Sequence, residues 1–333
     1  MSDPYGFALV EEHTEPTTLP DLVRALHGAF VPIASDLRVP PFDLTVVVTA
    51  DLTASVVARG IPGFDPERVG GQVRGKTLPI LPSYSKTVIV IDAGSAPQGD
   101  EFHEAEWVSL VSHEYGHLFL SRLRAEAGTE PNPLARYPTP FEVGRILACA
   151  AADEYRCDLL SDAVLRAVAR YTVNGGEPQP VTLATLRGPL YTGELALAHD
   201  EIVHPGWPNL IDRYRTGRID LADMYETLVR QVDGITKLVA HADAVATSAG
   251  LPPVLTGGED KRGIGLYLRA AWMPIRAILD ETPMIPCLDE FAEIDTAVYT
   301  AGAGIADMLH KLGVRGEVTA NNELYLHVTE PAR

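Results

Sequence analysis

Two histidines four residues apart, His113 and His117, are the side chains of this sequence whose types and spacing best predict chemistry. In a helix they would lie on one face, one turn apart. Neutral imidazole nitrogens are common ligands of divalent zinc, and a carboxylate directly after the first histidine can lie beside the metal without binding it. The pattern therefore predicts His113 and His117 as metal ligands and Glu114 as a general base. The alternative is a chance match between two surface histidines.

An acidic stretch further along the chain offers a third ligand. A catalytic zinc site needs three protein ligands with water in the fourth position, and a carboxylate serves well as the third. Glu154 and Asp158 are four residues apart and share a helical face. We predict that Glu154 binds the metal and that Asp158 accepts a hydrogen bond from the other ring nitrogen of a ligating histidine. Asp153 is the main competitor for the ligand role, and a solvated, salt-bridged helix face is the alternative interpretation.

Both groups lie in predicted helices. Apolar residues recur at helical spacing after Asp100, a candidate N-cap, and Gly128 can take the left-handed conformation that ends a helix. Thr139 can cap a second helix, with Pro140 at its first position and Glu142 completing a capping box. This second helix is predicted to run to about residue 171 and to carry the acidic stretch.

A small sheet is predicted before the first of these helices. Residues 44–49 and 87–91 are β-branched runs of strand length, residues 73–80 can form a short strand, and residues 21–37 have the apolar spacing of a helix. The edge of such a sheet could hold an extended peptide across the metal. We nominate residues 87–91 as that edge, with a fully buried core strand as an equally good interpretation.

The motif His113-Glu114-Tyr115-Gly116-His117, followed by Glu154-Tyr155-Arg156-Cys157-Asp158, resembles the gluzincin clan of zinc metallopeptidases, whose signature is HExxH followed by ExxxD. The resemblance covers roughly residues 87–162. Cys157 is a departure, since such helices often carry a small alanine there. No glycine and third histidine follow the motif as in the metzincins.

The resemblance implies one zinc ion per chain, held by His113, His117 and Glu154, with Asp158 behind the ligands. Glu114 would be the base that activates the zinc-bound water and later carries its proton. Gluzincins usually add a downstream histidine or tyrosine that stabilises the oxyanion. His199, His204 and Tyr191 are the candidates in this chain.

Composition narrows the range of functions. The 333 residues are 46% hydrophobic and 22% charged, with a formal net charge of -18, as in a globular enzyme with an acidic surface. This charge argues against a nucleic-acid or membrane-surface partner. The start has no pattern of a secretory signal, no apolar run is long enough to cross a bilayer, and the three cysteines form no C-x-x-C pair. We expect a cytoplasmic protein.

The predicted fold is α+β: a zincin-like core, with a small sheet packed on the metal-binding helix and the glutamate-bearing helix, and then a mainly helical region. We place the domain boundary between residues 172 and 173. Residues 173–208 are expected to be rich in loops, residues 288–312 to form one helix, and the end to form a β-hairpin. The predicted function is a zinc-dependent metallopeptidase acting on a peptide or protein. The alternatives are a zinc hydrolase of a non-peptide amide, a catalytically dead scaffold, and a regulatory module whose helical region binds a partner protein.

Overall fold

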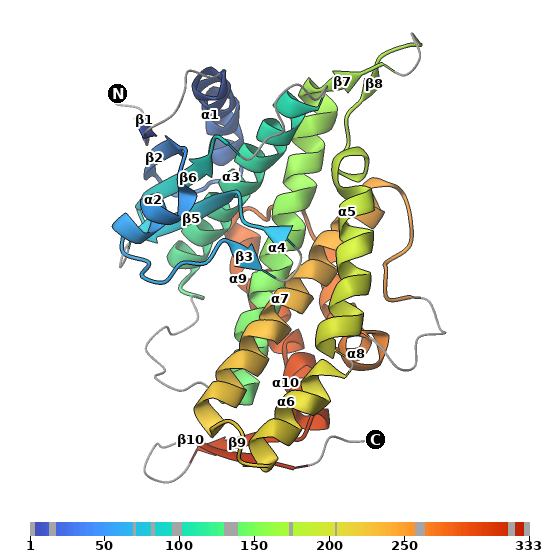
Figure 1. Cartoon of the computed structure of the whole chain (residues 1–333). Helices are drawn as coiled ribbons and strands as arrows, with labels where there is room; N and C mark the ends of the chain where they lie inside the picture. Colours follow the sequence, from blue (N-terminus) through green and yellow to red (C-terminus); the bar gives the residue numbers. More distant parts are fainter. Residues whose placement is uncertain are drawn as a thin grey trace. The chain divides into compact units, whose positions relative to one another are not determined.

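The structure is a computed structural model (Figure 1) that describes residues 4–12, 18–68, 71–80, 84–94, 102–129, 139–172, 176–203, 205–256, 264–318 and 324–329. It confirms the α+β class, because long helices accompany one small mixed sheet. The chain forms two compact units. The first comprises Met1–Glu130, Arg156–Gly188 and Met284–Ala292, and the second comprises Pro131–Tyr155, Pro189–Pro283 and Glu293–Arg333. The boundary expected between residues 172 and 173 stays a prediction.

The sheet of the first unit has the strand order β1-β2-β6-β5. β1 (Tyr5–Glu12), β2 (Phe42–Thr49) and β6 (Lys86–Asp92) are parallel, and β5 (Gly75–Ile80) runs antiparallel to β6. Two further two-stranded pairs are short: β3 (Glu67–Arg68) with β4 (Gly71–Gln72), and β7 (Arg170–Tyr171) with β8 (Gln179–Pro180). β1 was not predicted, because its few apolar residues have polar residues on both sides and the N-terminal segment was interpreted as polar.

The nomination of residues 87–91 as the sheet edge is wrong. β6 pairs with β2 on one side and β5 on the other, so it is internal, and β5 is an edge. The physical reason lies in the residues. Val88 to Ile91 is a continuous apolar run, which suits a strand covered on both faces, whereas β5 contains Pro79, which lacks an amide hydrogen and is tolerated at edges.

Helices cover both faces of this sheet. α1 (Leu19–Asp36) and α3 (His103–Ala127) share one core cluster with side chains of β1, β2 and β6. α2 (Leu52–Ala58) packs against the opposite face. Figure 1 shows α3 running along the sheet, and contacts with β5 and β6 fix it there. Gly128 has a φ of 66° and ends α3 as predicted. Asp100 lies outside the described residues.

α4 (Pro140–Val168) carries the acidic stretch and begins as predicted. The Thr139 hydroxyl accepts from the Glu142 amide at 3.2 Å, while the Glu142 carboxylate accepts from the Thr139 amide at 2.8 Å. This reciprocal pair is the capping box. The division between the two units falls inside α4, between Tyr155 and Arg156. One continuous helix therefore carries Glu154 in the second unit and Asp158 in the first.

The rest of the chain is mainly helical and ends in an antiparallel hairpin, as predicted. Its elements are α5 (Leu183–Ala198), the π-helix η1 (His199–Val203), α6 (Gly206–Arg215), α7 (Leu221–Ser248), α8 (Ile264–Glu281), α9 (Leu288–Ala301), α10 (Ala303–Lys311), β9 (Val314–Val318) and β10 (Leu324–Val328). No helix in the described part of the chain combines the length and apolar character needed to cross a membrane.

Two expectations for this region are wrong. Residues 173–208 are largely helical, because the turn signals at the two ends of this segment flank good helix formers, and Thr182 accepts from the Thr185 amide at the start of α5 at 3.1 Å. Residues 288–312 form two helices that break at Gly302. A side chain there would lie 2.6 Å from the Arg145 backbone, so the close approach requires glycine.

Candidate metal centre

His113 and His117 lie on one face of α3, as their spacing predicts. Their Nε2 atoms are 3.1 Å apart, and the two ring planes are inclined by 74°. Two nitrogens bound at 2.0 to 2.1 Å to one tetrahedral metal ion would be separated by about 3.3 Å. The distance and the type of donor therefore fit a shared divalent ion.

Asp158 lies behind His113. Its Oδ1 atom is 2.8 Å from Nδ1 of His113, and both side chains are largely buried, with 7% and 15% exposed, respectively. An ionised carboxylate can only accept a hydrogen bond, so the hydrogen of a neutral His113 ring lies on Nδ1 and its Nε2 keeps the lone pair. This tautomer is the one that binds a metal through Nε2. The predicted proximity of Asp158 to a motif histidine is thus present, while its role toward a metal stays a prediction.

Glu114 is buried between α3 and the edge strand β5, with 5% of its surface exposed. The Thr77 hydroxyl lies 2.6 Å from its Oε2 atom and 3.1 Å from its carbonyl oxygen. Gly75 makes room for the carboxylate, because a methyl group at that position would lie 2.9 Å from Oε1. The edge strand β5 therefore holds the predicted base.

Tyr115 anchors α3 on the side away from the histidines. Its ring stacks on Phe30 with centroids 4.5 Å apart, and its hydroxyl lies 3.0 Å from Nδ1 of His27. Burial raises the pKa of Tyr115 far above its usual range, so the phenol stays neutral. This packing fixes the rotation of α3 and therefore the direction in which His113 and His117 project.

α3 and the first-unit part of α4 pack closely and run in opposite directions. A methyl group on Gly116 would lie only 2.7 Å from Cys157 Sγ, so glycine permits the close approach. Three contacts step along the helices: Gly116 against Cys157, His113 against Asp158, and Ser109 against Ser161.

This packing brings a thiol to the histidines. Potential ligand atoms of His113, His117 and Cys157 all lie within 4.8 Å of one another, so these three residues could hold a metal ion. The thiol is buried. Cysteine and histidine together are a known donor set for zinc. Cys157 is therefore a candidate ligand that was not predicted from the sequence.

In the second unit, Glu154 lies beside an aromatic pair. Nε2 of His241 is 3.7 Å from a carboxylate oxygen of Glu154, and the His241 ring stacks on Tyr191 at 5.2 Å with 3° between the planes. His241 projects from α7 and Tyr191 from α5. The adjacent Tyr155 is fixed by the Thr247 hydroxyl at 3.1 Å. Glu154 thus has a defined environment of its own, and it stands one helical turn before Asp158 in α4.

The remaining predicted residues have different surroundings. Asp153 is the residue before Glu154, so its side chain points about 100° away around α4. His199 is in η1, where Nδ1 lies 2.5 Å from the exposed Asp200 carboxylate. Tyr191 is the only one of the three oxyanion candidates for which a described contact leads to Glu154, through His241. His204 lies outside the described residues.

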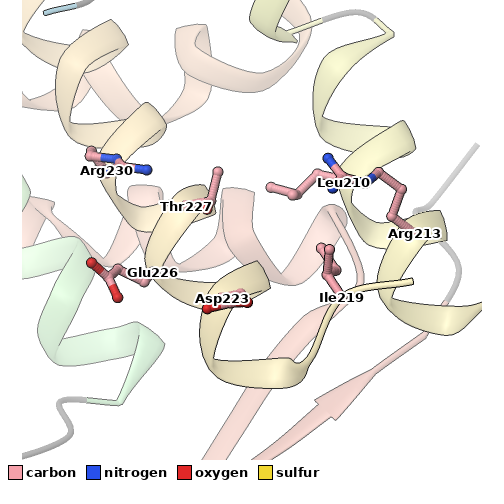
Figure 2. Close-up of a pocket in the computed structure, with 7 residues that line it drawn as sticks. All are labelled: Leu210, Arg213, Ile219, Asp223, Glu226, Thr227 and Arg230. Carbon is pink, nitrogen blue, oxygen red and sulfur yellow. The ribbon is translucent and has the colours of Figure 1, made fainter. Parts of the chain in front are cut away.

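A separate pocket of about 320 Å³ lies between α6 and α7 within the second unit (Figure 2). It contains none of the predicted site residues. Arginines and carboxylates both line it, so it has no single charge preference. The lining residues are Leu210, Arg213, Ile219, Asp223, Glu226, Thr227 and Arg230.

Sequence reasoning missed three neighbours of the predicted residues: Thr77 beside Glu114, Cys157 beside the two histidines, and His241 beside Glu154. One feature of the sequence could have indicated Thr77: it lies on a predicted strand, two residues after a glycine that could allow close packing. Cys157 lies between Glu154 and Asp158 in the sequence, so it could have been considered as a third metal ligand. Nothing in the spacing of His241 relates it to Glu154, because the two residues belong to different helices far apart in the sequence.

No protein-family model, curated protein sequence or solved structure matches this chain. The assignment of a function therefore depends on the chemistry of its own residues.

Proposed function

We propose that this protein is a zinc-dependent metallopeptidase with a zincin-like core, in which Glu114 activates the water that attacks a peptide bond. The single observation that carries the proposal is the convergence of the His113 and His117 Nε2 atoms at 3.1 Å. Asp158 orients the His113 ring. Glu114 directly follows His113 in the sequence, and its side chain is buried. A pair of surface histidines would not need either arrangement.

The proposed ligands are His113, His117 and Glu154. Zinc, when bound, supplies a Lewis acid that polarises the scissile carbonyl and makes water nucleophilic near neutral pH. Asp158 keeps the hydrogen of His113 on Nδ1. Glu154 is favoured because it shares α4 with Asp158 at a spacing of one turn. Cys157 is the competing third ligand, and both donor types suit zinc.

Glu114 performs the proton transfers in this proposal. Its carboxylate takes a proton from the attacking water as the new carbon–oxygen bond forms, and gives it to the amine as the carbon–nitrogen bond breaks. The products are a carboxylic acid and an amine, so one water is consumed and Glu114 returns to its starting state.

The edge of β5 that has no strand partner among the described residues is the proposed place for a peptide. The carbonyl oxygen of Arg74 accepts from the Asp92 amide at 2.9 Å, so residues 74, 76, 78 and 80 direct their backbone groups toward β6. Backbone groups of alternate residues point to opposite sides of a strand, so Gly75 and Thr77 direct theirs toward the open edge. An extended peptide adding to this edge would lie along the strand that holds Glu114.

The first test combines zinc content with cleavage. The purified wild type and Glu114→Gln are dialysed exhaustively, analysed for metal, and incubated with a peptide library. We expect about one zinc in each protein, and cleavage by the wild type alone. A metal-free wild type, or equal cleavage by both proteins, would contradict the proposal. Bound zinc without peptide cleavage would direct the assay to non-peptide amides.

A further inference from the structure

We propose that Thr77 is a positioning residue for Glu114: its hydroxyl holds Oε2 against β5, and so fixes the carboxylate that exchanges protons with the attacking water and the leaving amine. This inference rests on the proposed peptidase function. The two carboxylate oxygens of Glu114 have different surroundings. Oε2 lies 2.6 Å from the Thr77 hydroxyl, whereas Oε1 packs against Gly75, where a methyl group would lie 2.9 Å from it.

The short distance identifies the stronger of the two contacts that Thr77 makes. A hydroxyl has one hydrogen, and 2.6 Å is the distance of a charge-assisted O–H···O⁻ bond. The Glu114 carbonyl oxygen, at 3.1 Å, is the second acceptor within reach. The hydrogen therefore belongs to the carboxylate when Glu114 is ionised, and this bond keeps Oε2 against β5.

The same two distances allow the carboxylate to keep its place during the proton transfers. When Oε1 carries the proton taken from water, Oε2 remains an acceptor and the bond from Thr77 persists. If the proton moves to Oε2, the Thr77 oxygen can accept it while its own hydrogen turns to the Glu114 carbonyl oxygen. No heavy atom has to move in either case, so the geometry of the base is the same before and after each transfer.

The position of Thr77 on β5 gives this contact a further consequence. The proposed peptide would pair with the backbone of Gly75 and Thr77, the two residues that define the positions of Oε1 and Oε2. A substrate aligned on this edge is therefore aligned with the base through the same strand, β5.

The experiment compares Thr77→Val, which removes the hydroxyl but keeps the shape, with Thr77→Ser, which keeps the hydroxyl. We expect kcat of Thr77→Val to fall about ten- to hundredfold with KM changed less than about twofold, and Thr77→Ser to recover most of kcat. Thr87→Val is the matched control. Thr87 is a buried threonine of the neighbouring strand β6 that makes no described contact with Glu114, and its loss should leave kcat unchanged.

A second readout does not require activity. In zinc-free protein labelled with ¹³C at the glutamate carboxyl, the Glu114 resonance is identified by its absence in Glu114→Gln. We expect this resonance to shift in Thr77→Val and to stay in place in Thr77→Ser and Thr87→Val. An unshifted resonance in Thr77→Val, or a Thr77→Ser variant as slow as Thr77→Val, would overturn the inference. An inactive wild type with the expected shift would contradict the peptidase while preserving the contact.

Discussion

The Nδ1 atom of His113 and the Oδ1 atom of Asp158 lie 2.8 Å apart, which ties the HExxH helix to the helix of the acidic stretch. The contact sets the tautomer of His113 and its ring orientation with one bond. It also places the aspartate four residues after Glu154 beside the first histidine of the motif.

Replacing Asp158 by asparagine should weaken zinc binding about 10- to 100-fold, because the carboxylate that orients His113 is lost. A titration against a chelator of known affinity measures this change. Asp162→Asn is the matched control. Asp162 lies one turn further along α4 and accepts from the Leu183 amide at 2.7 Å, so its loss should affect stability and leave zinc affinity unchanged. An equal loss of affinity in both variants would show that the effect is not specific to His113.

The third ligand can be identified by comparing Glu154→Ala with Cys157→Ala. We expect Glu154→Ala to lose most of its zinc during dialysis, and Cys157→Ala to keep about one ion per chain. Cobalt substitution gives an independent check, because a thiolate ligand produces a strong charge-transfer absorption. That absorption in the wild type, together with zinc loss in Cys157→Ala, would assign the ligand to Cys157 in place of Glu154.

Gly116→Ala should destabilise the first unit by about 1 to 3 kcal/mol. The added methyl group would lie 2.7 Å from the Cys157 sulfur and 3.1 Å from its Cα atom, so α4 has to move away from α3. Chemical denaturation measures the free energy of unfolding. Cys157→Ala in the same chain should recover part of the loss by removing the sulfur. Additive effects of the two substitutions would contradict this steric explanation.

Thr87→Val should stabilise the protein by about 1 kcal/mol. The Thr87 hydroxyl is buried and finds no hydrogen-bond partner among the described residues, so a methyl group of the same shape removes a polar group that gains nothing from burial. The midpoint of urea unfolding should rise without a change of slope. A lower midpoint would show that the hydroxyl has a partner in the folded protein.

Asp243→Asn should destabilise the second unit by about 2 to 4 kcal/mol at neutral pH. The carboxylate is fully buried, and its two oxygens accept from the Trp272 indole and the Val254 amide, each at 2.6 Å, with Arg276 Nε 3.6 Å away. Asparagine retains one acceptor, so one of the two donors would face an amide nitrogen. Urea denaturation at pH 7 measures the loss.

The pH dependence of that difference has a defined sign. Burial raises the pKa of Asp243 above its ordinary value of 3.8, and the hydrogen bonds and Arg276 offset this only partly. The folded protein therefore binds more protons at Asp243 than the unfolded chain between 3.8 and the raised pKa. The stability of the wild type relative to Asp243→Asn should grow as pH falls through this window and level off below it. A difference that shrinks with falling pH would contradict the raised pKa.

The sequence by itself determined the local features of this protein. The spacing of His113 and His117 sets their common face, Thr139 and Glu142 set the start of α4, and Gly128 sets the end of α3, because each depends only on neighbours within a turn or two. The α+β class followed from the same periodicities. The separation of four residues between Glu154 and Asp158 likewise placed both carboxylates on one side of a helix.

Only the tertiary structure decided which residues from distant segments meet. β5 and not β6 forms the sheet edge, so Thr77 and Gly75 are the residues that hold Glu114. The close approach at Gly116 brings the Cys157 thiol to the histidines. Strand order and helix docking arise from long-range burial and shape, which no local pattern encodes. Pairings of this kind therefore become visible only when the chain is folded.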